Sequence, residues 1–275
     1  MPQNNFNRTI ADIADFEYKI TADGIILTKY IGSGGEVIIP RGHDGLPVVG
    51  IGGSAFEECK NVTGIILPEG ITSIGDWAFM CCSSLATITI PNSVTDMGDN
   101  VFEGCTALTA IVIPSGIAYI GDCAFTDCIN LSFIDLPDHI ASVGDSAFAG
   151  CIGLTDIALP KGVANIGDFA FYGCSSLNSI TIPDGVTIIG AGAFCECVSL
   201  TDITIPNSLA SIRRKTFCDC IALTTVTIPA SVTYIAEEAF KNCPNLTVLC
   251  PENSHAWQYC EENGIRHKSL ASADK

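Results

Sequence analysis

Apolar and polar positions recur along the chain with a constant spacing of 23 residues. One unit, LATITIPNSVTDMGDNVFEGCTA from Leu85 onward, divides into three short pieces. The first, L-x-x-I-x-I, has the apolar spacing of a short strand whose Leu and Ile side chains face inward. Pro91 ends this strand because proline offers no N–H to a β-ladder. A second apolar pair, Val94 and Met97, starts the return path.

The third piece, Gly-Asp-x-Ala-Phe, predicts a single helical or 3-10 turn. An aspartate stands where this turn would begin, and its carboxylate could accept hydrogen bonds from free backbone N–H groups. The aspartates at this position are Asp76, Asp99, Asp122, Asp145 and Asp168.

The repeat runs without insertion or deletion from Phe56 to Phe240. A phenylalanine recurs every 23 residues, and a cysteine follows each one three positions later. One unit alone cannot bury its Leu, Ile and Phe side chains. Units stacked side by side would share one long core and a parallel sheet.

The fuller pattern, C-x-x-L-x-x-I-x-I-P-x-x-V-x-x-I-G-x-x-A-F, resembles the BspA-type leucine-rich repeats of bacterial and protozoan surface proteins. It occurs here as CSSLATITIPNSVTDMGDNVF and CIGLTDIALPKGVANIGDFAF, among others. The resemblance covers roughly residues 16 to 265. It implies an α/β repeat solenoid, a right-handed superhelix with a parallel sheet on one face and short helical or 3-10 turns on the other. It also implies binding, adhesion or scaffolding at the cell surface or after secretion.

The ends should differ from the middle, because a solenoid must cover its core at both faces. We expect a flexible N-terminus over 1–15, one solenoid over 16–265 and a tail over 266–275. Within the solenoid, 16–50 would form a hairpin cap and a first irregular unit, 51–250 the regular repeats and 251–265 a helical cap. Ser254 and Gly264 are suited to begin and end that last helix.

The composition narrows the possible partners. Of the 275 residues, 48% are apolar and 16% charged, and the net charge is -17. Such a chain is too apolar for intrinsic disorder and too acidic for binding nucleic acid. No run of 18 apolar residues is present, which argues against membrane insertion. The first residues lack the apolar segment of a signal peptide, so a cytoplasmic location is the alternative to the cell surface.

Nine of the fifteen cysteines fall in one column of the repeat. Parallel side chains in such a column disfavour disulfides, so we expect a row of small buried groups with weak S–H donors. Cys195-x-Cys197 and Cys218-x-Cys220 bring four thiols together in adjacent units. A zinc or iron–sulfur site, a Cys195–Cys218 bridge and incidental loop cysteines are the alternatives. C-x-C is not the usual metal knuckle, so the sequence assigns no metal and no cofactor.

Catalysis finds little support in the sequence. The four histidines are scattered and show no metal-ligand spacing. A serine or cysteine nucleophile would need a histidine held by a third group. The regular aspartates and glycines are explained as turn residues. We therefore assign no catalytic residue and expect that the chain is not an enzyme.

The candidate ligand-binding residues lie where the repeat displays unusual side chains. The third and fifth positions of L-x-x-I-x-I point away from the core and are mostly small residues or threonine. Phe133 stands out there beside Asp135 and Asp156, and Asp202 occupies the same face. An exposed aromatic ring among carboxylates could stack on a sugar or anchor a basic peptide.

Charge marks two further regions. Residues 61–160 contain eleven acidic residues and no Lys or Arg. In contrast, Arg213, Arg214 and Lys215 replace the Gly-Asp-x stretch of their unit. These three could contact a partner or could neutralise neighbouring carboxylates.

The most consistent interpretation is a non-catalytic recognition or adhesion module that binds a protein partner through a rigid surface. A carbohydrate-binding module and a structural spacer that presents another domain are the alternatives. An incompletely covered end would also favour end-to-end self-association.

Overall fold

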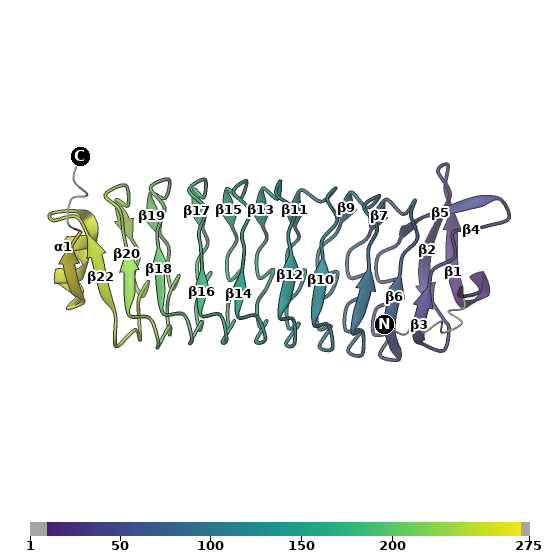
Figure 1. Cartoon of the computed structure of the whole chain (residues 1–275), viewed down its shortest axis with the longest axis horizontal. Coiled ribbons are helices and arrows are strands. Elements are labelled where there is room, and N and C mark those ends of the chain that lie inside the picture. The colour runs from purple at the N-terminus through teal and green to yellow at the C-terminus, as the bar shows by residue number, and fades with distance from the viewer. Residues whose placement is uncertain (1–9, 271–275) are drawn as a thin grey trace, which may run out of the picture.

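The computed structural model describes residues 10–270 and forms an elongated solenoid of stacked repeats (Figure 1). The hairpin of β1 (Phe16–Ile20) and β2 (Ile25–Tyr30) lies at one end of the long axis, and α1 (His255–Asn263) lies at the other. Residues 1–9, part of the expected flexible N-terminus, lie outside the described residues.

Two columns of strands run along the solenoid. The first column carries the L-x-x-I-x-I segments and comprises β3 (Gly35–Ile38), β6 (Val62–Ile66), β8 (Thr87–Thr89), β10 (Ala110–Val112), β12 (Phe133–Asp135), β14 (Asp156–Ile157), β16 (Ser179–Ile180), β18 (Asp202–Thr204), β20 (Thr225–Thr227), β22 (Thr247–Cys250) and β23 (Arg266–Ser269). Parallel ladders join β3-β6-β8, β10-β12, β14-β16 and β18-β20-β22-β23.

The return path forms the second column, which the sequence did not predict as a sheet beyond the hairpin expected within 16–50. It comprises β1 (Phe16–Ile20), β2 (Ile25–Tyr30), β4 (Gly42–His43), β5 (Leu46–Ile51), β7 (Ser73–Ile74), β9 (Asp96–Met97), β11 (Tyr119–Ile120), β13 (Ser142–Val143), β15 (Asn165–Ile166), β17 (Ile188–Ile189), β19 (Ser211–Ile212) and β21 (Tyr234–Ile235). Pairing is antiparallel in β1-β2 and β4-β5 and parallel in the other pairs.

The Gly-Asp-x-Ala-Phe segments form short turns, as expected, closed by hydrogen bonds between residues three positions apart: the N–H of Ala124 donates to the carbonyl of Gly121 at 3.3 Å. Other backbone N–H groups of these segments donate to the next repeat: that of Asn100 donates to the carbonyl of Asp122 at 2.8 Å, and that of Phe102 to the carbonyl of Ala124 at 2.9 Å. Within residues 10–270 the helical elements are η1 (Ile13–Asp15) and α1 (His255–Asn263). The turns therefore add a third ladder between repeats.

The aspartate column also acts between repeats. Asp76 Oδ1 accepts a hydrogen bond from the backbone N–H of Asp99 at 2.9 Å. The same bond links each later aspartate to the next, and Asp168 accepts from the N–H of Ala191 at 2.7 Å. The carboxylates therefore accept backbone N–H groups, as predicted, and these N–H groups belong to the neighbouring repeat.

The core is a continuous column of phenylalanine rings beside the cysteine row. From Phe79 to Phe240, neighbouring ring centroids lie 5.3 to 5.5 Å apart with interplanar angles of 2 to 12°. From Cys82 to Cys243, each row thiol donates to the carbonyl of the phenylalanine 26 residues earlier, at 3.0 to 3.2 Å. All fifteen cysteines are free thiols.

Both ends of the solenoid are covered, and more of the chain is ordered than we expected. At the N-terminal end, Ile10 forms a bridge with Ile38, and η1 follows it. At the other end, the Ser254 side chain caps α1, and Gly264 ends it with a φ of 65°. The predicted tail from 266 begins instead as β23, which pairs with β22. The sequence of β23, RHKS, has no apolar alternation; backbone pairing with β22 holds this strand, together with the His267 ring, whose centroid lies 4.4 Å from that of the Trp257 ring.

Candidate functional site

The strand face around β12 displays an aromatic side chain to solvent. Ile134 points into the core, so its neighbours Phe133 and Asp135 point outward. The Phe133 side chain is 57% exposed. A large apolar group held on a regular strand is accessible without any rearrangement of the fold.

Parallel pairing places further apolar groups beside this ring. Ala110 is the register partner of Phe133, and Val112 is the partner of Asp135. Val112 is 60% exposed, so Ala110, Val112 and Phe133 form one apolar patch on β10 and β12. Val112 is not among the residues predicted from the sequence. It could have been found because threonine is the commonest residue at the equivalent outward-facing position of the other repeats.

Carboxylates flank this apolar patch. Asp135 lies on β12, and Asp156 occupies the position equivalent to Phe133 on β14, which contacts β12. The Thr155 hydroxyl donates to Asp156 Oδ2 at 3.2 Å. Asp202 has the same environment, with Thr201 donating at 2.9 Å, but it lies two repeats beyond Asp156. The structure thus groups Phe133, Asp135 and Asp156 and separates Asp202 from them.

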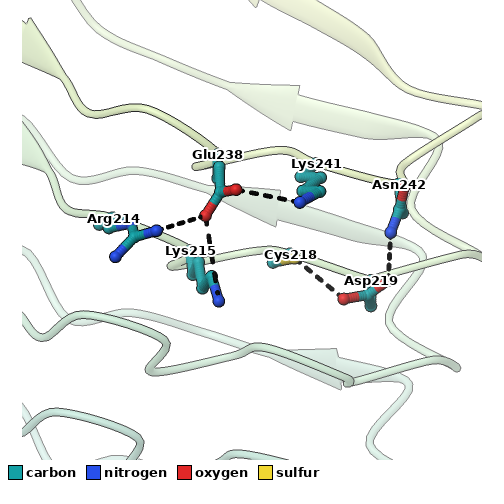
Figure 2. Close-up of polar contacts among 7 residues, drawn as sticks. All are labelled: Arg214, Lys215, Cys218, Asp219, Glu238, Lys241 and Asn242. Carbon is teal, nitrogen blue, oxygen red and sulfur yellow. Dashed lines mark hydrogen bonds and ion pairs between the residues drawn. The ribbon is translucent and has the colours of Figure 1, made fainter.

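The basic residues of the candidate set lie on the turns and not on the strand face. The Glu238 carboxylate forms ion pairs with three side chains, at nitrogen-to-oxygen distances of 3.0 Å for Arg214, 3.9 Å for Lys215 and 2.9 Å for Lys241 (Figure 2). The hydrogen bond from Lys241 is the largest of the effects that lower the pKa of Glu238.

Arg213 has a different partner. Its Nη1 lies 3.6 Å from Asp168 Oδ1, at the last carboxylate of the aspartate column. All three consecutive cations therefore pair with carboxylates, which favours charge neutralisation over a free basic site.

One group of possible metal ligands occurs among residues 10–270. The ligand atoms of Cys195, Cys218 and Asp219 all lie within 4.8 Å of one another. Both thiols are buried, and burial is the main effect that raises their pKa values. Cys218 Sγ donates to Asp219 Oδ2 at 2.9 Å (Figure 2).

Comparison with known proteins agrees with this architecture. The family described as BspA type leucine rich repeat region matches residues 45–155 and 142–258. No curated protein sequence matches the chain. Among the residues described, no helix combines the length and apolarity needed to cross a bilayer.

Two solved structures of bacterial proteins share the fold, and a third is less similar. A leucine-rich repeat protein from Bacteroides ovatus is 24% identical, with a TM-score of 0.55, and the match covers 97% of this chain and 100% of that one. The pneumococcal vaccine antigen PcpA is 14% identical, with a TM-score of 0.53 and coverage of 97% and 99%. A leucine rich cell surface protein from Faecalibacterium prausnitzii is 22% identical, with a TM-score of 0.47 and coverage of 97% and 96%.

Proposed function

Since the chain belongs to the BspA type leucine-rich-repeat family, we propose that it is a non-catalytic recognition module that binds a protein partner. The binding surface is the apolar patch of Ala110, Val112 and Phe133 with its flanking carboxylates, Asp135 and Asp156. The observation that carries this proposal is the exposure of Phe133 and Val112 at diagonal positions of two paired strands.

The rigidity of the scaffold favours binding at this patch. The core beneath it contains a column of stacked phenylalanine rings, and backbone hydrogen bonds join each repeat to the next. A preformed surface loses little conformational entropy when a partner binds. An aromatic side chain at the centre of a patch is also a common source of binding energy in protein interfaces.

Charge defines the chemistry of the partner. The patch lies within residues 61–160, which contain eleven acidic residues and no Lys or Arg. A partner segment with an apolar side chain between Lys or Arg residues would complement both features. Attraction between the acidic region and the basic partner would speed association at low salt, and it would weaken as the salt concentration rises.

Two other functions can be separated from this one. A carbohydrate could stack on Phe133 and bond to Asp135 and Asp156, but the neighbouring Val112 isopropyl group offers no hydrogen bond to a sugar hydroxyl. A spacer would have no saturable ligand. We propose a cell-surface location from the family, and proteolysis of intact source cells tests it because a surface protein is cleaved and a cytoplasmic one is protected.

The binding experiment compares two paired substitutions. Val112→Ala/Phe133→Ala removes the patch, whereas Ser179→Ala/Thr181→Ala changes the positions equivalent to Phe133 and Asp135 two repeats away. Both proteins and the unaltered chain are screened against a displayed peptide library and a glycan array. We expect basic peptides with an apolar centre to be enriched by the unaltered chain and the Ser179/Thr181 variant, with at least tenfold weaker binding to the Val112/Phe133 variant.

Equal peptide binding by both variants would place the interaction elsewhere. Saturable binding to glycans alone would favour the carbohydrate function. Absence of any saturable ligand for the unaltered chain would favour the spacer.

A further inference from the structure

Two thiols outside the core row stand next to each other on adjacent repeats. Cys195 directly follows Phe194, and Cys218 directly follows Phe217, so they occupy equivalent positions 23 residues apart. Stacking holds these positions at the spacing of neighbouring parallel strands, about 4.8 Å. Asp219 comes from the same turn as Cys218 and lies beside both thiols.

Packing and hydrogen bonds hold each of these three side chains in place. Cys195 is 6% exposed and Cys218 3% exposed, so packing restricts both side chains. Asp219 Oδ2 accepts the hydrogen bond from Cys218 Sγ, and Asp219 Oδ1 accepts one from Asn242 Nδ2 at 2.7 Å (Figure 2). Asn242 thereby orients the carboxylate, in the way that outer hydrogen bonds orient metal ligands.

We propose that Cys195, Cys218 and Asp219 form a binding site for one divalent metal ion of the zinc class. Two sulfur ligands and one carboxylate oxygen suit zinc and exclude the hard ions magnesium and calcium, which take oxygen ligands. Three protein ligands leave a fourth position for water or for a group of a bound partner. This site goes beyond the proposed recognition function, lies on the turns and revises the expectation of no metal.

The other cysteines lack this arrangement. The row thiols from Cys82 to Cys243 each donate to a phenylalanine carbonyl. Cys81 and Cys123 lie outside the row, half-buried, at two different positions of the repeat. Those two thiols therefore serve as matched controls for a site that needs a pair.

The local charges suit a bound cation. Two thiolates and one carboxylate carry three negative charges, which a divalent ion reduces to one. The positive charge of Lys215 favours the ionised forms of both Cys195 and Asp219, and that of Lys241 favours ionised Asp219. Two cations therefore lie near the remaining negative charge. Glu196 also faces Cys195, and its Oε1 accepts a hydrogen bond from the Tyr172 hydroxyl at 2.6 Å.

Metal binding releases protons. Each thiol gives its proton to solvent as its sulfur bonds to the ion, so one ion displaces two protons. Burial raises the pKa of Cys195, and burial with the hydrogen bond to Asp219 raises that of Cys218 to about 12. Both thiols are therefore protonated at neutral pH, and affinity should rise with pH by up to about 100-fold per unit.

The test is a titration of the reduced, full-length protein with Co²⁺, followed by competition with Zn²⁺. We expect one Co²⁺ per chain with a sulfur-to-cobalt charge-transfer absorption. Cys195→Ser and Cys218→Ser should each lower the affinity at least 100-fold, whereas Cys81→Ser and Cys123→Ser should leave it unchanged. Asn242→Ala should lower it about 10- to 100-fold.

Asp219→Asn keeps the proposal testable if a cysteine variant fails to fold, because Asp219 is only half-buried. It should lower the affinity while the circular dichroism spectrum and melting temperature stay as in the unaltered chain. Binding of Co²⁺ without the sulfur absorption, or with an absorption that survives in both Cys195→Ser and Cys218→Ser, would overturn the proposal.

Discussion

The thiol of Cys128 lies 3.1 Å from the backbone carbonyl oxygen of Phe102, one repeat earlier, and donates a hydrogen bond to it inside the core. The same relationship recurs along the row. Because the thiol is the donor, the bond requires its protonated form. Burial also raises the pKa of these thiols, to about 12 for Cys128 and Cys174.

We therefore predict that the protein unfolds at alkaline pH. An unfolded thiol has a pKa of about 8.5, so below that pH neither state loses a proton and the row contributes its full stability. Above it, the unfolded state loses protons that the folded state keeps, and stability falls by about 1.4 kcal/mol per pH unit for each buried thiol until the folded pKa is reached. Urea unfolding at pH 8, 9 and 10 measures this slope. Cys128→Ala removes one buried thiol and should make the fall in stability less steep by about 1.4 kcal/mol per pH unit. A constant free energy of unfolding from pH 8 to 10 would contradict the prediction.

The aspartate column predicts a difference between two substitutions at Asp122. Its Oδ1 accepts the backbone N–H of Asp145 at 2.8 Å. Asp122→Ala removes this acceptor and should lower the free energy of unfolding by about 1 kcal/mol. Asp122→Asn keeps an acceptor oxygen and removes a negative charge from a column of like charges, so its stability should equal or exceed that of the unaltered chain. Equal losses in both variants would show that the charge, and not the hydrogen bond, matters.

The glycine before each aspartate allows neighbouring turns to approach closely. A Cβ at Gly144 would lie 2.8 Å from the backbone nitrogen of Asp122, which is held by its hydrogen bond to Asp99 Oδ1. Gly144→Ala should therefore destabilise the protein by about 1 to 3 kcal/mol. Gly185 offers the control, because its Cβ would meet the carbonyl oxygen of Lys161 at 3.4 Å, an ordinary contact. Comparable melting temperatures for the two variants would argue against close approach as the reason for glycine at this position.

The C-terminal cap predicts the oligomeric state of a damaged chain. Ala256 and Cys260 are buried where α1 covers the last repeat, and the Tyr259 ring packs edge-on to Phe240 with centroids 6.3 Å apart. Ala256→Glu places a charge in this contact and should displace the helix, because an unpaired buried charge is costly. The exposed core should then drive concentration-dependent self-association, measured by sedimentation velocity. Glu262→Ala, an exposed change on the same helix, should sediment as the unaltered chain does.

The repeat period predicted which side chains form the core, because a fixed spacing leaves each column in one environment. Phe102, Leu108 and Cys105 are all fully buried as expected. Contacts between repeats were harder to predict. The bond from Asp145 N–H to Asp122 Oδ1 depends on how neighbouring turns align, and the Arg213–Asp168 pair joins residues 45 positions apart. The pair of Phe133 and Asp156 was easier to predict, because the two residues occupy equivalent positions 23 residues apart and β12 and β14 stack.

The stacking of similar repeats also determines how the molecule responds to a pulling force. Among residues 10–270, the main contacts between elements join a repeat to its two neighbours, and none of them joins one end of the stack to the other. A pull applied to the two termini would therefore peel repeats off singly, starting at an end. Each 23-residue repeat would release about 80 Å of chain. Such a protein lengthens in steps under tension while the repeats still stacked keep their shape.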